Sequence, residues 1–422
     1  MMLKRHSPLM PDWCLYATIA LGIGSSLSWT VEAAVNHDSL QNLIFRGSQL
    51  SIAIPPTNTR RRVENFVCSK NEYPPPIKDR VESYKVDLDS DPRDRWSQLV
   101  KLKKQELQTL VGDVKEILGG MLLALLDDEL PLLAHTLPSP YREEIIGIAD
   151  ATGIPLGEVT LYNIFYEVFT FCTSIIAKDI SGTIIHGRNL DFGLFLGWDK
   201  QNNTWRVTEH LRPLVVETTF IKGGQVLYKS TGFVGHIGIL TAVKPGAFSL
   251  SIDERFGMDA GILGILKWIL GDRSGTWLGF LTRSVMEEET TYEAALRRLS
   301  DTRLLAPVYF ILAGPSTGAV VTRWKKKYDV WELDDKAAAP WYLVETNYDH
   351  WDKPPFFDNR RDPAIACLER AGQHALNRSL LYDVLSTRPI LNKLTTYTSL
   401  MEPSSGALES WLRWCPDPCP TW

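Results

Sequence analysis

The chain has 422 residues, of which 44% are hydrophobic and 23% are charged. This length and composition are typical of a globular protein with one large domain or two moderate ones, and they exclude a disordered chain. The formal net charge of -5 offers no basic excess for a nucleic-acid partner, so we expect none, whereas lipid and small-molecule substrates remain open.

Residues 1–34 have the pattern of a secretory signal peptide. Lys4 and Arg5 precede an apolar stretch at 14–27, and small residues follow at a spacing that suits cleavage before position 35. The stretch is too short to span a membrane, and no later segment reaches about 18 uninterrupted apolar residues. We therefore expect a soluble mature protein that enters the secretory route, with an uncleaved N-terminal anchor as the alternative.

The cysteines fit the oxidising environment of that route. One of the six leaves with the signal peptide and Cys172 is considered separately below. The other four allow three pairings, and they are Cys68, Cys367, Cys415 and Cys419. The last two enclose Pro-Asp-Pro and can close a tight local loop, so the first two would pair across almost the whole sequence. The spacings lack the repeated short-gap pairs of a zinc site, and we expect no metal.

Two segments match the acceptor pattern for N-glycosylation. They begin at Asn202 and Asn377, where the chain reads Asn-Asn-Thr and Asn-Arg-Ser. The pattern is common by chance, and it gains weight from the signal peptide. We expect glycosylation at both asparagines.

The part of the chain before Cys172 is predicted to be mostly helical. Residues 35–66 show no periodicity and are expected to be a flexible start, whereas apolar residues recur at helical spacing over 95–118. The apolar run at 121–126 indicates a core helix, or alternatively a helix that contacts lipid or a partner. One more helix is predicted over 158–169, shortly before Cys172.

At Cys172 the pattern changes to short runs rich in β-branched residues. Strands at 173–177 and 183–186 are separated by turn residues, which predicts a hairpin that begins at this cysteine. Further strands are predicted at 214–221, 225–230, 237–243, 248–252, 308–312 and 320–323, with helical blocks at 261–270 and 277–299. Strand runs interrupted by helical blocks indicate an α+β architecture of stacked sheets flanked by helices.

Cys172 is the candidate nucleophile. If the bond between Phe171 and Cys172 is cut, the cysteine becomes a chain terminus whose own α-amine can take the thiol proton, so no histidine is needed. Arg188 and Asp191 follow in the run His-Gly-Arg-Asn-Leu-Asp-Phe-Gly, and a hairpin return would bring them to the thiol and the α-amine. The structural alternative is a buried cysteine near a surface ion pair.

Three residues further along the chain complete the candidate site. Asn347 offers an amide donor for the oxyanion of a tetrahedral intermediate, and Arg360 offers a cation. Glu254 could assist proton transfer during self-cleavage or orient a donor. Taken singly, Asn347 is more often a turn residue, Arg360 a solvated surface charge and Glu254 the partner of Arg255 in an ion pair.

Several motifs together resemble the acid ceramidase family and occur in the family's order. They lie at 171–193, 251–256, 346–351, 358–363, 382–389 and 415–419. The resemblance implies an Ntn-hydrolase fold, which is an αββα sandwich of antiparallel sheets with an N-terminal, mostly helical chain. It also implies catalytic roles for Cys172, Arg188, Asp191, Glu254, Asn347 and Arg360.

The same resemblance implies self-cleavage between Phe171 and Cys172. The products would be a propeptide-like α subunit at 35–171 and a β subunit at 172–422 with the catalytic core, linked by a disulfide as a heterodimer. The implied reaction is hydrolysis of ceramide, and of other N-acyl lipids, to a fatty acid and an amine such as sphingosine through a Cys172 thioester. A lysosomal or secreted location, transient contact with a membrane or vesicle surface and a saposin-type activator are implied as well, with no cofactor.

Two alternatives remain open on sequence alone. Amidases that hydrolyse N-acylethanolamines share the Cys-Thr-Ser and Gly-Arg-Asn-Leu-Asp patterns, and a catalytically silent, secreted lipid-binding homologue would keep the fold without the cut. The sequence also departs from the family pattern at Phe171, where a β-branched aliphatic residue is expected, and residues 1–66 show no match.

Overall fold

The computed structural model describes residues 66–118, 130–164, 170–192, 197–255, 268, 271–333, 341–355 and 358–420. The signal peptide, the flexible start up to residue 65, the apolar run at 121–126 and most of the predicted helix at 261–270 lie outside these ranges. Contacts divide the chain into residues 1–62 and residues 63–422, and all the described residues belong to the second unit.

The larger of two main sheets has eight strands in the order β1-β6-β7-β8-β9-β10-β11-β12. The strands are β1 (Ser83–Asp87), β6 (Val215–Lys222), β7 (Gln225–Phe233), β8 (Thr241–Lys244), β9 (Phe248–Glu254), β10 (Val308–Ala313), β11 (Gly318–Arg323) and β12 (Tyr328–Glu332). Neighbouring strands are antiparallel except β1 and β6, which pair in parallel. The predicted antiparallel sheets are confirmed, and β1, which comes from the N-terminal part of the chain, adds one parallel pair at the edge.

The second sheet carries the region around Cys172. It has five antiparallel strands in the order β13-β2-β3-β14-β15. Their bounds are β2 (Thr170–Lys178), β3 (Ile184–Phe192), β13 (Tyr342–Glu345), β14 (Thr395–Glu402) and β15 (Ala407–Leu412). A separate two-stranded ribbon consists of β4 (Trp198–Asp199) and β5 (Thr204–Trp205).

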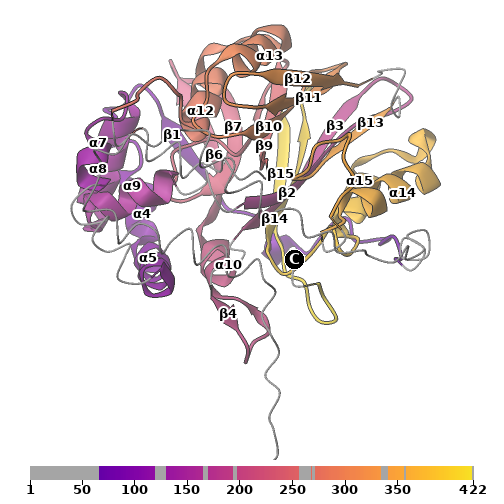
Figure 1. Ribbon diagram of the computed structural model, residues 1–422, viewed down its shortest axis with the longest axis horizontal. Coiled ribbons are helices and arrows are strands. Elements are labelled where there is room, and N and C mark those ends of the chain that lie inside the picture. The colour runs from indigo at the N-terminus through magenta and orange to yellow at the C-terminus, as the bar shows by residue number, and fades with distance from the viewer. Residues whose placement is uncertain are drawn as a thin grey trace, which may run out of the picture. The chain divides into compact units, whose positions relative to one another are not determined.

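The two main sheets face each other, as the alternation of side chains along β2 shows. Ile176 packs into a cluster with Tyr309 and Ile311 of the opposite sheet, whereas Ile175 and Ala177 belong to a cluster on the other face. That outer cluster includes residues of α14 (Arg361–Ala371) and α15 (Arg378–Ser386), which cover the five-stranded sheet (Figure 1).

Helices also cover the outer face of the eight-stranded sheet. Phe248, Leu250 and Ile252 of β9 belong to the main core cluster together with residues of the N-terminal helices and of two later helices. The helices are α4 (Ser97–Leu102), α5 (Lys104–Leu118), α7 (Leu130–Ala134), α8 (Tyr141–Thr152), α9 (Leu156–Ile164), α12 (Leu278–Glu288) and α13 (Tyr292–Asp301). A further helix, α10 (Arg206–Leu211), packs against α5. The architecture is an αββα sandwich, and the predicted α+β class is confirmed.

Glycine at position 187 fixes how closely α15 approaches β3. A Cβ atom there would lie 2.8 Å from a methyl carbon of Leu381 and 3.0 Å from one of Leu385, too close for any other residue without a shift. The close approach lets the Asn189 side chain donate to the carbonyl of Leu385 at 2.8 Å. β3 is thereby held from outside while its inner face carries the residues described below.

Two disulfides join the pairs that the cysteine spacing indicates. Cys68 is bonded to Cys367 of α14, 299 residues away, and Cys415 is bonded to Cys419. Cys172 takes part in neither bond. The first disulfide ties the start of the described chain to the layer of helices that covers the sheet of Cys172.

The structure changes several predicted boundaries. The helix predicted over 95–118 is divided at Lys103 into α4 and α5, and the block at 277–299 is divided into α12 and α13. β2 begins at Thr170, two residues before the predicted hairpin start, because pairing with β3 continues through the uncut Phe171-Cys172 bond. No helix in the described ranges is long and apolar enough to cross a membrane.

Both predicted glycosylation sites lie on exposed positions. Asn202 is in the turn between β4 and β5, and Asn377 caps the N-terminus of α15 by accepting from the Leu380 amide at 2.9 Å. Glycosylation of these residues stays a prediction.

Candidate active site

Cys172 lies in the middle of the sandwich. It is the third residue of β2, it stands opposite Leu190 of β3, and its side chain is fully buried. Phe171 precedes it in the same strand, in a small apolar cluster with Trp205 and Leu394. The structure thus shows the uncut chain, with the bond proposed for cleavage inside a strand.

The thiol of Cys172 is held by Arg188. Ser174 is the direct cross-strand partner of Arg188, so the arginine is a diagonal neighbour of Cys172 on the inner face of the sheet. Its Nη2 donates to the sulfur at 2.9 Å and to the carbonyl of Ile252 at 2.6 Å. Burial raises the pKa of the Cys172 thiol to about 12 in the uncut chain, and the Arg188 charge opposes this rise by favouring the thiolate.

The backbone nitrogen of Cys172 is held by Asn347, which is the second residue after β13 and is 175 residues away in the sequence. The side-chain oxygen of Asn347 accepts the Cys172 N–H at 2.9 Å and a guanidinium N–H of Arg360 at 2.7 Å. Since both partners are donors, the atom that they share must be the amide oxygen. Its nitrogen donates to the main-chain carbonyl of Glu254 at 2.7 Å.

The arrangement of Asn347 differs from the sequence-based prediction of an oxyanion donor. In the uncut chain the amide nitrogen is already engaged by Glu254, whereas the oxygen orients the nitrogen that would become the α-amine. Glu254 contributes its main-chain carbonyl to this contact, and the role predicted for its carboxylate stays a prediction.

Arg360 connects the other face of Cys172 to two carboxylates. It precedes α14, it is fully buried, and it donates to the main-chain carbonyl of Cys172. Its Nε and Nη2 bind the Asp358 carboxylate at 2.6 and 2.8 Å, and its Nη1 lies 3.6 Å from Asp191. These two carboxylates raise the pKa of Arg360 against the opposing effect of burial, so the arginine stays charged.

Asp191 lies on the face of β3 that is opposite to Arg188. Burial raises the pKa of its carboxyl to about 6, while the nearby Arg360 charge lowers it. The Asn392 side chain donates to the same carboxyl at 3.0 Å. The structure thus places Asp191 beside Arg360, with Arg360 between it and the backbone of Cys172.

The other five predicted residues therefore lie around Cys172, and they come from β3, the end of β9, the segment after β13 and the position before α14. Two buried carboxylates were missed by the sequence analysis, Asp358 and Asp253. Asp253 is one residue before Glu254, and strand alternation sends its side chain into the sandwich, where its carboxyl lies 3.8 Å from Arg188. The alternation Ser249-Leu250-Ser251-Ile252-Asp253 was the signal that could have revealed this polar face.

The arrangement suits acyl transfer by a thiol. One cation lies on the sulfur, another lies on the adjacent carbonyl, and the nitrogen of the same residue is oriented by an amide oxygen. Within the described ranges, no cluster of three or more His, Cys, Asp or Glu is arranged to hold a metal ion.

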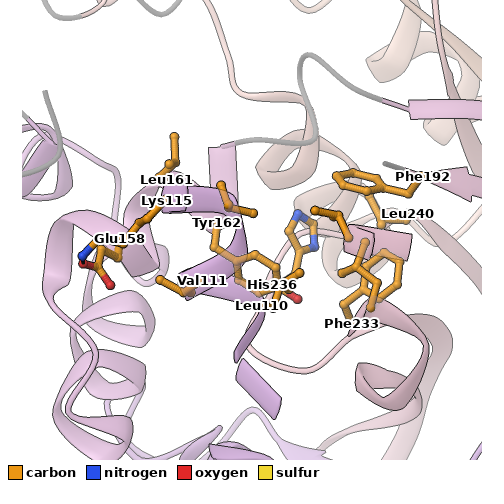
Figure 2. Close-up of a pocket in the computed structure, with 13 residues that line it drawn as sticks. Leu110, Val111, Lys115, Glu158, Leu161, Tyr162, Phe192, Phe233, His236 and Leu240 are labelled. Carbon is orange, nitrogen blue, oxygen red and sulfur yellow. Dashed lines mark hydrogen bonds and ion pairs between the residues drawn. The ribbon is translucent and has the colours of Figure 1, made fainter. Parts of the chain in front are cut away.

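An apolar pocket lies close to this site. It has about 620 Å³ of empty space, including its open side, and Figure 2 shows Lys115 and Glu158 at one end and Phe192, Phe233 and Leu240 toward the other. Lys115 and Glu158 form an ion pair at 2.5 Å. The far end adjoins the site, because Leu240 accepts a hydrogen bond from Arg188 through its carbonyl.

Comparison with known proteins agrees with the chemistry of this site. Residues 172–361 match the family model of linear amide C–N hydrolases, choloylglycine hydrolase family. Residues 79–137 match the model for the beta subunit of N-acylethanolamine-hydrolyzing acid amidase. The fold and these matches define the chain as an amide hydrolase of the Ntn type.

Curated relatives define the family more narrowly. Acid ceramidase of Mus musculus is 45% identical over 409 residues, which is 94% of this chain and 99% of the mouse protein. Acid ceramidase of Homo sapiens is 47% identical over 366 residues, which is 84% of this chain and 92% of the human protein. The chain belongs to the acid ceramidase family. Among solved structures, the Caenorhabditis elegans N-acylethanolamine-hydrolyzing acid amidase ortholog is 32% identical, covers 57% of this chain and 100% of its own, and has a TM-score of 0.49.

Proposed function

We propose that this protein hydrolyses the amide bond of ceramide, releasing sphingosine and a free fatty acid, after it has cut its own chain between Phe171 and Cys172. The observation that carries the proposal is the pair of contacts on one residue: Arg188 binds the Cys172 thiol and Asn347 binds the Cys172 nitrogen. A thiol and an amine on one residue, both held in position, are the parts that an N-terminal nucleophile needs. Relatives named acid ceramidase match along almost their whole length.

Self-cleavage would proceed as an acyl shift followed by hydrolysis. The Cys172 sulfur attacks the carbonyl carbon of Phe171, the bond from that carbon to the Cys172 nitrogen breaks, and a thioester forms while the nitrogen gains a proton. Water then hydrolyses the thioester, which leaves a carboxylate on Phe171 and a free thiol and α-amine on Cys172. Arg188 and Arg360, which flank the reacting backbone, favour the negative charge that develops.

The mature enzyme would use the same groups on ceramide. The α-amine takes the thiol proton, the thiolate attacks the amide carbonyl, and the protonated amine returns its proton to the departing sphingosine nitrogen. Water then releases the fatty acid from the Cys172 thioester. An unbound α-amine has a pKa near 7.7 to 8.0, so it is closer to the working range than a lysine amine.

The cut would divide the chain into an α subunit at 35–171 and a β subunit at 172–422. The disulfide between Cys68 and Cys367 joins a residue of the first to a residue of the second. The α subunit contributes β1 to the eight-stranded sheet, and its helices α4, α5, α7, α8 and α9 share the main core cluster with strands of the β subunit, so both pieces form one core. A disulfide-linked heterodimer is the expected mature form.

The apolar pocket supports a lipid substrate. Its lining comes from α5 and α9 of the α subunit and from β3, β7 and α10 of the β subunit, and almost all of it is aliphatic or aromatic (Figure 2). A hydrocarbon chain gains about 0.8 kcal/mol per buried CH₂ group, so such a pocket favours long acyl chains. We propose that it receives an apolar tail of the substrate.

Side-by-side hydrolysis of ceramide and an N-acylethanolamine with the same acyl chain, at acidic pH, tests the substrate. We expect release of fatty acid from ceramide at the higher kcat/KM. Preferential turnover of the N-acylethanolamine would move the protein to the related amidase activity. If neither lipid is cleaved and intact mass shows no cut before Cys172, the protein is a silent lipid-binding homologue.

We propose that the protein binds its lipid substrate at a membrane surface and that it is lysosomal or secreted. The hairpin between β11 and β12 carries Trp324 and Lys325 to Lys327, and the Trp324 ring, which is 36% exposed, stacks on Trp351, which is 50% exposed. Arg255 lies 4.0 Å above Trp324 and follows Glu254 directly. We call Trp324, Trp351 and the three lysines the aromatic-basic patch; exposed indole rings and lysines suit an anionic lipid surface.

The double substitution Lys326→Gln and Lys327→Gln is expected to weaken binding to anionic vesicles by about 2 kcal/mol, or roughly 30-fold, because each lysine near such a surface contributes about 1 kcal/mol. Sedimentation with phosphatidylserine-containing vesicles measures it, and hydrolysis of detergent-dispersed substrate should be unchanged. The matched control is the double substitution Lys70→Gln and Lys78→Gln, two exposed lysines elsewhere. Equal loss in both variants would exclude the patch. A saposin-type activator would act at the same step, and it should raise turnover of vesicle-bound ceramide without affecting the detergent assay.

A further inference from the structure

Asp253 is a buried carboxyl at the site that the proposed reaction does not use. It lies on the face of β9 that points into the sandwich, together with Ser249 and Ser251, and all three side chains are fully buried. A buried carboxyl that faces a nucleophile is costly to keep charged, so its presence calls for a physical account.

Arg188 lies between this carboxyl and the thiol. Its Nη2 is 2.9 Å from the sulfur of Cys172 and 3.8 Å from Oδ1 of Asp253, and all three side chains are excluded from solvent. One guanidinium therefore serves two groups that can both become negative. Because charges interact strongly in a buried site, a carboxylate and a thiolate beside the same arginine disfavour each other's negative charge.

We propose that Asp253 is a positioning residue that makes the reactivity of Cys172 depend on pH through Arg188. In its neutral form it leaves the Arg188 charge to the thiolate, and in its charged form it competes for that charge. The proposal rests on the proposed function, because it assumes that the Cys172 thiolate is the attacking group.

A chain of hydrogen bonds fixes the position of the Asp253 carboxyl. The Ser174 hydroxyl donates to its Oδ1 at 2.9 Å and lies 2.8 Å from the Ser251 hydroxyl. The two ring nitrogens of His186 lie 2.9 Å from the hydroxyls of Ser251 and Ser249. Burial lowers the pKa of His186 to about 3, so the imidazole is neutral and adds no charge of its own. These hydrogen bonds orient the Asp253 carboxyl, and the protonation state of that carboxyl is what changes with pH.

Other titratable groups lie around Asp253. They are Cys172 on β2, Arg188 and Asp191 on β3, Tyr309 on β10, Glu345 on β13, Tyr397 on β14, and Arg360 before α14. Burial raises the pKa of Glu345 far above its usual range, which keeps it neutral, and burial raises the pKa of Tyr397 to about 12. Burial likewise raises the pKa of Asp253 to about 7, with Arg188 opposing the rise.

The sign of the effect follows from these positions. Below about pH 7 the Asp253 carboxyl is neutral, and Arg188 favours the thiolate of Cys172. As pH rises through that value the carboxylate appears and disfavours the thiolate, so activity should fall even though the solution removes protons more readily. The α-amine acts in the opposite direction because it must lose its proton to serve as a base. Activity would therefore have a limited pH range, and Asp253 would determine its upper limit.

Asp253→Asn tests this with an isosteric change. In the mature enzyme, the alkaline limb of the kcat/KM profile should move upward by about one to three pH units, the range over which a neighbouring charge shifts a pKa. Activity at low pH should change little. Asp253→Glu keeps the charge and should keep the upper limit of the parent enzyme, at a lower kcat. Asp150→Asn, a carboxylate exposed on α8, is the control for loss of one negative charge and should leave the profile in place.

Self-cleavage gives a second readout that needs no lipid. The rate of appearance of the two chains, followed against pH in Asp253→Asn, should show the same upward shift, so the inference stands or falls even if ceramide is not the substrate. A uniform loss at every pH, with the limb unmoved, would show that Asp253 is only structural and would overturn the proposal. A folded Asp253→Asn chain that stays uncut at all pH values would also overturn it. If Asp253→Asn does not fold, the test is the alkaline limb of the Asp253→Glu profile. A difference of more than about one pH unit from the parent enzyme would count against the proposal.

Discussion

Cys172→Ala is expected to remain a single polypeptide and to hydrolyse no lipid amide. The alanine keeps the backbone nitrogen and the strand pairing of β2, but it removes the sulfur that attacks in both self-cleavage and hydrolysis. Loss of one buried sulfur atom costs about 1 kcal/mol of stability, so the chain should still fold. Intact mass and hydrolysis of ceramide, before and after incubation at acidic pH, measure the two outcomes.

The disulfide gives this experiment an internal control. On a denaturing gel, the parent protein should run as one band without reductant and as two bands with reductant, since the disulfide between Cys68 and Cys367 joins the two pieces. Cys172→Ala should run as one band in both conditions. Cys68→Ser keeps the nucleophile but not the link, so it should release two pieces without reductant. A Cys172→Ala chain that is cut and active would remove the thiol from the mechanism.

The local part of the site was predictable from the sequence. Cys172, Arg188 and Asp191 lie in one hairpin, where strand pairing and alternation determine which side chains share a face. Alternation places Arg188 on the inner face of the sheet, together with Cys172, and it places Asp191 on the outer face. Arg360 then connects Asp191 to the backbone of Cys172. The hairpin predicted from the sequence thus explains why Arg188 contacts the thiol of Cys172 and why Asp191 lies on the opposite face.

The long-range part was not predictable in its detail. Arg360 and Cys172 are 188 residues apart, and they meet only because β13 pairs with β2 and α14 covers the same sheet. Strands β12 to β15 and helices α14 and α15 were also missed, although β14 and β15 complete the sheet that holds the nucleophile. The family resemblance supplied Asn347 and Arg360, whereas Asp253 and Asp358 needed the folded chain, since a carboxyl becomes part of a site through the charges that surround it.

Asn347→Ala is expected to slow self-cleavage and lipid hydrolysis by about 100-fold or more, the size of effect that follows when a reacting group is misplaced by about 1 Å. The side-chain oxygen holds the Cys172 nitrogen at 2.9 Å and is itself held by Arg360 at 2.7 Å. Without it, the nitrogen that must take the thiol proton loses its fixed direction. The rate of chain cleavage in the precursor and kcat in the mature enzyme measure the effect separately.

The comparison of these two rates decides which role Asn347 has. If its oxygen orients the nitrogen of Cys172, both rates fall together, because both reactions use that nitrogen. If its amide nitrogen served mainly as an oxyanion donor to bound substrate, kcat would fall much further than the cleavage rate. Asn359→Ala is the matched control, because that amide binds Asp362 at 2.7 Å at the start of α14, next to Arg360, and does not reach Cys172. If the cleavage rate and kcat of Asn347→Ala are both within a few-fold of those of Asn359→Ala, then the nitrogen of Cys172 does not need the Asn347 oxygen to orient it.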